Sequence, residues 1–209
     1  RGDFVLAVQA YRDLLASYRA GESSWLDEAK NRLDYLTKPS LQLSVGGTFV
    51  TGSEIQFGLS WRNLKQAEAT LYKLDMVESL GLQDTGARDS DGQPQRTGYS
   101  SYQEMLRQLV EQDGRYRSLP VQQRWSLLLE DEGKYQPYSA HKGLAEWRLE
   151  QKDGEIDPKL GVLPPGAYLL VATASGLKPT YELVLVTDLA LVSKVGNRVK
   201  GASELGDQS

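Results

Sequence analysis

Residues 54–61 constrain the fold most strongly, because large apolar side chains alternate there with polar or small ones without a break. The two sets are Ile55, Phe57, Leu59 and Trp61 against Glu54, Gln56, Gly58 and Ser60. Alternation with a period of two residues is typical of a β-strand that buries one face and exposes the other. The pattern therefore predicts a half-buried strand over residues 54–61.

Other short apolar segments lie between turn-forming residues such as Gly46-Gly47 and Gly52-Ser53. We predict further strands at residues 41–45, 67–74, 122–130, 144–150, 166–174 and 180–187, and the period-two stretch that contains 41–45 continues after Gly46-Gly47 over residues 48–50. Helical patterns do not alternate regularly with these segments, so a parallel βαβ sheet is not indicated. About seven strands joined by turns favour a mainly β fold, in which two antiparallel sheets form a sandwich.

A helix with one apolar stripe is predicted at the start of the chain. The stripe consists of Phe4, Val8, Tyr11, Leu15 and Tyr18, which recur at intervals of three or four residues. This spacing places them on one side of an α-helix. We expect the helix to stop at Gly21.

A second helix is predicted to follow, with Ser23 or Ser24 as its N-cap and Lys38-Pro39 at its end. Its apolar stripe consists of Leu26, Ala29, Leu33 and Leu36, and acidic residues occupy its first turn. Helices this short are marginal in water by themselves. We therefore expect the pair to bury its stripes against each other and against a further partner.

A third helix is predicted inside the β region. Ser101 and Glu104 form a capping box, and the helix is expected to close at Asp113-Gly114. Before it, residues 83–98 contain almost nothing apolar and are interpreted as a mobile surface loop.

These patterns divide the chain into three parts. We expect a helical hairpin over residues 1–38 and a β-sandwich over residues 39–192 that carries a loop and helix insertion at 77–118. Residues 193–209 are interpreted as a polar tail or the start of a following domain.

The composition removes whole classes of chemistry. The chain has no cysteine and one histidine, which excludes thiol nucleophiles, disulfides and cysteine-based zinc sites. A formal net charge of −4 gives no general attraction to nucleic acid, and no apolar stretch reaches the length of a membrane span. We therefore expect no nucleic-acid partner and no direct membrane span in this chain.

The candidate catalytic groups are the single histidine and two clusters of carboxylates. His141 lies in a turn-rich stretch without a nucleophile elbow of the G-x-S-x-G type and is interpreted as a surface histidine. Paired carboxylates are the groups that glycosidases use. The clusters here are residues 130–132 and Glu150, Asp153, Glu155 and Asp157, which we interpret as solvated strand-end loops.

Candidate binding motifs are equally incomplete. Residues 89–92 resemble half of a calcium loop, but Gln93-Pro94 follows where further ligands belong. Residues 1–3 match an integrin-type tripeptide, which at this length we interpret as coincidence. No glycine-rich phosphate loop occurs. We predict no catalytic residue, no metal ligand and no cofactor.

Basic and aromatic residues gather once in the chain. The set is Arg107, Arg115, Tyr116, Arg117 and Arg124. Acidic Glu111 and Asp113 are adjacent, so we interpret the set as a solvated helix end rather than a groove for a nucleic-acid strand. Trp61, Trp125 and Trp147 fall on predicted strands and are interpreted as core residues rather than as a sugar-binding platform.

An ordered series of segments resembles the first macroglobulin domain of bacterial alpha-2-macroglobulins. The segments are PSLQL (39–43), FVTGS (49–53), LSWRNL (59–64), ATLYKLD (69–75), LPPGAYLL (163–170) and LVTDLAL (185–191). The helical pair before Pro39 is similar to the helical segment that can precede this domain. The resemblance implies a seven-stranded macroglobulin or fibronectin-III-like antiparallel sandwich with an N-terminal helical hairpin and one inserted helix.

The same resemblance implies a function without catalysis. Members of this family are protease traps of the periplasm or cell envelope that are cleaved in a bait region and then enclose the attacking protease. Some carry a thioester within a Cys-x-Glu-Gln motif, which a chain without cysteine cannot contain. The chain would be an N-terminal scaffold and docking fragment, and any membrane anchor would lie in a region absent here.

The implied partners are other domains of the parent chain, target proteases that bind the full-length protein, and accessory periplasmic proteins. Two alternatives stay open. One is a cell-surface adhesion or carbohydrate-binding sandwich. The other is a hydrolase that uses the carboxylate clusters, in particular Glu150 and Asp157.

Overall fold

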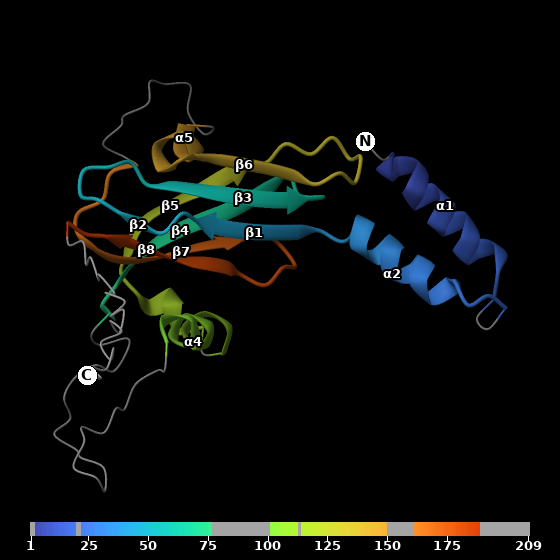
Figure 1. The fold of residues 1–209 in the computed structure, drawn as a ribbon, viewed down its shortest axis with the longest axis horizontal. Coiled ribbons are helices and arrows are strands. Elements are labelled where there is room, and N and C mark those ends of the chain that lie inside the picture. The colour runs from blue at the N-terminus through green and yellow to red at the C-terminus, as the bar shows by residue number, and fades with distance from the viewer. Residues whose placement is uncertain (1–2, 20–21, 77–100, 113, 150–160, 189–209) are drawn as a thin grey trace, which may run out of the picture.

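The computed structural model of the chain describes residues 3–19, 22–76, 101–112, 114–149 and 161–188. In these residues the chain forms eight strands in two sheets together with four α-helices. Two helices project from one end of the sheets, and a third lies across one face of them (Figure 1). The expectation of a β-rich chain with additional helices is therefore confirmed.

The smaller sheet contains the alternating segment that dominates the sequence. Its strand order is β1 (Ser40–Val45), β3 (Gln56–Arg62) and β6 (Tyr138–Gly143), and both pairings are antiparallel. The side chains of Phe57, Leu59 and Trp61 are buried, whereas Gln56 and Ser60 are exposed. The half-buried strand predicted over residues 54–61 is therefore present as β3.

The larger sheet has five strands and is mixed. Its order is β2 (Thr48–Phe49), β8 (Thr180–Val186), β7 (Gly166–Thr173), β4 (Gln66–Leu74) and β5 (Val121–Leu128). All pairings are antiparallel except the one between β2 and β8, which is parallel.

This arrangement differs from the predicted seven strands in purely antiparallel sheets. After β1 the chain turns at Gly46 and Gly47, where Gly47 has a φ of +101°. The two residues of β2 then pair with β8 of the larger sheet instead of returning along β1. A strand of two residues has no alternation pattern of its own, so this pairing is decided by its neighbours.

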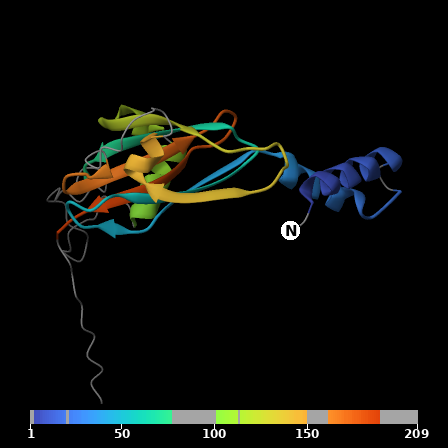
Figure 2. The ribbon, with the colours of Figure 1, turned by 90° about the horizontal axis from the view of Figure 1, so that it is seen from above.

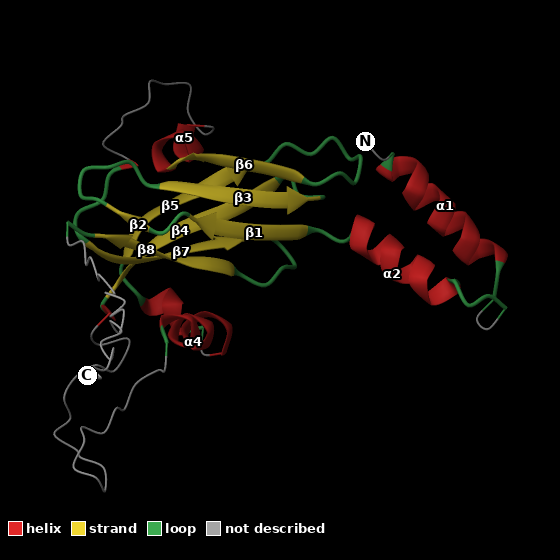
Figure 3. Cartoon of the chain, in the orientation of Figure 1, coloured by secondary structure: helices red, strands yellow, loops and turns green. Residues whose placement is uncertain are grey.

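One apolar core joins the two sheets. Phe57 and Leu59 of the smaller sheet belong to the same buried cluster as Leu127, Tyr168 and Leu170 of the larger one. Each of these side chains is at most 1% exposed, so each contributes about 1.5–3 kcal/mol to folding through burial. Figure 3 shows the strands of the two sheets lying over one another.

The inserted helix covers the other face of the larger sheet. α4 (Tyr102–Arg107) continues into a π-helix, η1 (Gln108–Gln112), and is followed by a 3₁₀-helix, η2 (Arg115–Ser118). Ser101 accepts a hydrogen bond from the backbone N–H of Glu104 at 3.2 Å, as the capping box predicts. These elements bury apolar side chains, among them Met105 and Tyr116, in a second core against β4 and β7.

The strand predicted at residues 144–150 is wrong, because the structure has helix α5 (Leu144–Leu149) there. The backbone N–H of Gly143 donates to the Glu146 carboxylate at 3.0 Å, and Trp147 turns inward. The preceding turn-rich stretch is instead strand β6. Its small and polar residues carry little strand signal, but β3 supplies a complete antiparallel partner.

The two predicted N-terminal helices are present as α1 (Phe4–Ser17) and α2 (Leu26–Thr37). α1 ends at Ser17, earlier than predicted, and Gly21 lies outside the described residues. The predicted N-cap of α2 is wrong, since Trp25 occupies that position without a side-chain hydrogen bond. Figure 2 shows the hairpin extending beyond the end of the sheets.

The predicted loop at 83–98 and the tail at 193–209 lie outside the described residues, and the division at residues 38 and 192 stays a prediction. In the part of the chain that the structure describes, no helix is long and apolar enough to cross a membrane.

Candidate functional site

His141 lies on the outer, solvent-facing side of the smaller sheet. It is exposed and pairs in register with Gly58 of β3, which in turn faces Ser44 of β1. A Cβ atom at Gly58 would lie 2.7 Å from Ser44 Oγ and 3.2 Å from His141 Nδ1, so both side chains lean over the glycine. The Ser44 hydroxyl donates to the Gly58 carbonyl at 3.4 Å. The predicted surface position of His141 is confirmed.

The three strand-region tryptophans are core residues. Trp61, Trp125 and Trp147 are 6%, 4% and 1% exposed, so their rings are not available as a sugar-binding platform. Trp61 Nε1 donates to the Glu130 carbonyl at 2.8 Å, and Trp147 Nε1 donates to the Phe57 carbonyl at 3.1 Å. Trp125 Nε1 is buried without a hydrogen-bond partner among the described residues.

The carboxylate cluster at residues 130–132 lies in the loop between β5 and β6. Asp131 accepts a hydrogen bond from the Gly133 backbone N–H at 2.9 Å, which is turn chemistry, and Glu132 forms an exposed ion pair with Lys134. The second cluster at residues 150–157 lies outside the described residues, as does the calcium-like segment at 89–92. Among the described residues, no group of three acidic or histidine side chains could hold a metal ion.

The basic and aromatic set is divided among three elements, with Arg107 at the end of α4, residues 115–117 on η2 and Arg124 on β5. Arg117 lies on η2 with its guanidinium 4.9 Å from the centre of the Tyr116 ring, whereas Arg124 lies on β5 and donates to Thr70 Oγ1 at 3.3 Å. Tyr116 is buried and packs edge-on against Tyr72 with ring centres 5.6 Å apart. Its ring therefore offers no face to a nucleobase.

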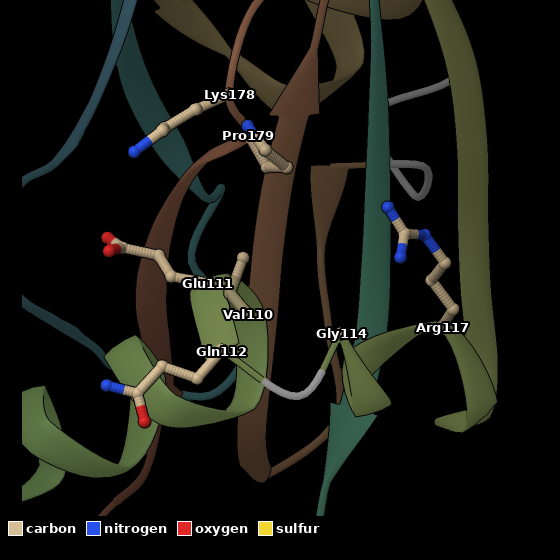
Figure 4. Close-up of a pocket in the computed structure, with 7 residues that line it drawn as sticks. All are labelled: Val110, Glu111, Gln112, Gly114, Arg117, Lys178 and Pro179. Atoms are coloured by element: carbon tan, nitrogen blue, oxygen red, sulfur yellow. The ribbon is translucent and has the colours of Figure 1, made fainter.

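A surface pocket of about 410 Å³ lies between η1, η2 and the turn before β8 (Figure 4). Its lining residues are Val110, Glu111, Gln112, Gly114, Arg117, Lys178 and Pro179. Figure 4 shows Glu111 and Lys178 on the same side of the pocket, with Arg117 on the opposite side. No local pattern in the sequence indicates this grouping, because Lys178 is far from the other lining residues along the chain.

The acidic group of this pocket is held by a tyrosine of β8. The Tyr181 hydroxyl donates to Glu111 at 2.7 Å. Burial of Tyr181, together with this hydrogen bond to a carboxylate, raises the pKa of Tyr181 to about 12. The phenol therefore stays protonated at neutral pH and acts as a hydrogen-bond donor rather than as a base.

The helical hairpin carries the main concentration of exposed apolar side chains in the described residues. Leu6, Trp25 and Tyr35 are 67%, 69% and 64% exposed, and Val5 and Tyr18 are nearly half exposed. We call these five residues the hairpin apolar set. Among the residues of α1 that the structure describes, only Val8 is fully buried. Sequence analysis placed Tyr18 on the buried stripe and did not consider Leu6 or Trp25.

Two short helices cannot cover each other completely, and α1 packs on α2 rather than on the sheets. Exposed apolar side chains mark interaction sites where they gather on one part of a surface, and five of the nine large exposed apolar side chains of the described residues lie on this hairpin. The hairpin apolar set is therefore the best-supported candidate functional surface of the chain.

No protein-family model and no curated protein matches this sequence. Among solved structures, the chain has a distant likeness to β-glucosidase from Listeria innocua in complex with isofagomine, with 11% identity and a TM-score of 0.33 over 74% of this chain. A second structure of β-glucosidase from Listeria innocua has 10% identity and a TM-score of 0.32. The chain covers only 17% and 16% of those two structures, and at these TM-scores the likeness carries no argument.

Proposed function

We propose that this chain is a non-catalytic scaffold and docking fragment of a larger protease-trapping inhibitor of the bacterial alpha-2-macroglobulin type. The observation that carries the proposal is the hairpin apolar set, which projects beyond a pair of sheets whose own core is already filled. A chain that leaves such side chains exposed is suited to packing against further protein.

The two sheets support this proposal through their shape. A macroglobulin-type sandwich has to be a self-contained unit that packs beside similar units, and here both faces of the larger sheet are covered by the chain itself. We propose that the added β2 is a local variation on the seven-stranded form. The periplasm or cell envelope is the proposed location of the parent protein.

The described polar groups that were candidates for chemistry make structural contacts. His141 lies on the exposed face of the smaller sheet. The Tyr181 hydroxyl donates a hydrogen bond to Glu111, the carboxylate that lines the pocket at η1. Acyl transfer and glycoside hydrolysis need a nucleophile or acid held beside a second group in a shared cleft. The carboxylates of the hydrolase alternative, at residues 150–157, lie outside the described residues, so the role without catalysis stays a proposal.

The test uses the full-length product of the gene that encodes this chain. It is mixed with a trypsin-like protease, and the protease is then assayed with a small peptide and with a large protein as substrates. Enclosure admits the small substrate and excludes the large one, so we expect loss of activity on the protein substrate alone. Unchanged digestion of the protein substrate would contradict the proposal.

Matched variants connect the result to the hairpin. We expect the double variant Leu6→Glu/Trp25→Glu to weaken trapping, because it places charge on the proposed docking surface. Lys30→Glu, an exposed polar change on α2, should leave trapping unaltered.

The carbohydrate-binding alternative has exposed aromatic rings in its favour, of which Trp25 at 69% and Tyr35 at 64% are the most exposed among the described residues. A glycan array with the purified chain distinguishes it from the docking role. Saturable binding that disappears in Trp25→Ala would favour the alternative, and its absence would favour docking.

A further inference from the structure

The hairpin meets the sheets at the end of α2, where two consecutive side chains from the end of β3 reach its last turn. Arg62 Nη1 donates to the Tyr35 carbonyl at 2.9 Å. Asn63 Nδ2 donates to the carbonyls of Leu36 at 2.8 Å and Lys38 at 3.3 Å. Carbonyls in the last turn of a helix have no partner within the helix, so these bonds complete α2 from outside.

Arg62 is unusual because it is a buried cation at this junction. It is 7% exposed, and its Nε is buried without a hydrogen-bond partner among the described residues. Its guanidinium lies 4.5 Å from the centre of the Tyr35 ring. Its charge is thus balanced by the negative end of the helix and by an aromatic face rather than by a carboxylate.

Asn63 reaches α2 because its backbone adopts a left-handed conformation, with a φ of +53°. Asparagine tolerates this conformation better than most residues with a side chain. The turn after β3 therefore directs the amide back toward the helix.

Without these contacts the covalent connection would hold the hairpin only weakly. Lys38 and Pro39 are the two residues between the end of α2 at Thr37 and the start of β1 at Ser40. α1 packs on α2, so the direction of both helices depends on how α2 is held at this junction.

We propose that Arg62 and Asn63 form a clamp that holds the hairpin in one fixed direction relative to the smaller sheet. The clamp makes the hairpin a rigid extension of β3, and the hairpin apolar set is consequently presented at a constant position. This inference does not depend on the protease-trap proposal, because it concerns the geometry of the isolated chain.

Distance measurements between spin labels test the clamp directly. The chain has no cysteine, so introduced cysteines are the only positions that the label modifies. The labels are placed at Ala16→Cys on α1 and Ser139→Cys on β6. Both positions are exposed. We expect double electron–electron resonance to give one narrow distance distribution for the doubly labelled chain.

Removing the clamp should broaden this distribution at least about twofold. Arg62→Met keeps an apolar stem but deletes the donors, and Asn63→Gly keeps the left-handed backbone while deleting the amide. Arg32→Gln is the matched control, since Arg32 is exposed on α2 and bonds only to Glu28 of the same helix in the described residues. It should leave the distribution narrow.

A broad distribution in the parent chain would overturn the clamp, as would an unchanged narrow one in Arg62→Met/Asn63→Gly. Circular dichroism reports whether each variant is folded. If Arg62→Met does not fold, Arg62→Gln/Asn63→Gly replaces it, because glutamine keeps a polar side chain but removes the guanidinium that bonds to the Tyr35 carbonyl and lies against its ring. A narrow distribution in that variant overturns the proposal equally.

Discussion

At the scale of single residues, the buried ring of Trp61 connects segments of the β region that are distant along the chain. Trp61 donates a hydrogen bond to the Glu130 carbonyl and stacks on Tyr138 with ring centres 5.8 Å apart. It thereby connects β3 to the neighbouring strand β6 and to the loop between β5 and β6. Trp25, by contrast, is 69% exposed on the hairpin.

This contrast yields a paired prediction. We expect Trp61→Ala to lower the free energy of unfolding by about 3–5 kcal/mol, because it leaves a cavity and an unpaired carbonyl. Trp25→Ala should change it by less than about 0.5 kcal/mol. Denaturant midpoints measure both, and an unshifted midpoint for Trp61→Ala would contradict the buried position of the ring.

A second residue-scale prediction concerns alkaline pH. The pKa of Tyr181 is raised to about 12 from an ordinary value of 10.0, first by burial and then by Glu111. The folded chain favours the protonated phenol, so this contribution to stability is complete below about pH 10 and is lost as the pH rises toward 12. We expect Glu111→Gln to lower the pKa of Tyr181 only in part, because burial remains.

Nuclear magnetic resonance of the tyrosine rings measures this titration, and Tyr181→Phe identifies the signal. A pKa of Tyr181 that is the same in Glu111→Gln and in the parent would contradict the hydrogen bond.

At the scale of elements, α1 begins where a side chain satisfies free backbone donors. Asp3 accepts hydrogen bonds from the backbone N–H groups of Val5 and Leu6, both at 3.0 Å. We expect Asp3→Ala to destabilise the hairpin by about 0.5–2 kcal/mol and to speed amide exchange in the first turn of α1. Asp3→Asn retains an acceptor and should behave like the parent, and equal exchange in all three chains would argue against the cap.

The elements also show where prediction from sequence succeeds. The stripe of α2 and the alternation of β3 identify side chains that are buried together, so local spacing was enough there. In α1 the spacing predicted the helix, but of its stripe only Val8 is buried and Tyr18 is exposed. Local spacing was not enough for β6 and α5. In β6, Ser139, His141 and Gly143 have little intrinsic preference for a strand, and the strand forms because β3 pairs with it.

At the scale of the whole molecule, the sheets hold their own core and the hairpin is an addition to it. Neither apolar cluster of the described residues contains a hairpin side chain. We therefore expect a chain that begins at Pro39 to remain folded, with near-native β-sheet circular dichroism and a single cooperative unfolding transition. Loss of cooperative unfolding would show that the hairpin is required for the fold.

The same separation predicts where a fluorescent apolar dye binds. We expect 8-anilinonaphthalene-1-sulfonate to bind the whole chain and to bind the chain lacking residues 1–38 much less, because the hairpin apolar set is removed. Equal fluorescence enhancement in both would place the main exposed apolar surface on the sheets.

The amino-acid sequence by itself determined the periodic elements and the residues that fill the core, because side-chain spacing dictates which face of a helix or strand leaves water. It also indicated that the tryptophans of the β region are buried. Only the tertiary structure decided that β2 pairs in parallel with β8 and that Arg62 is buried beneath Tyr35. It also decided that residues 138–143 form a strand and residues 144–149 a helix. Those features depend on partners that are distant along the chain, and a local pattern contains no information about which distant backbone group will be near.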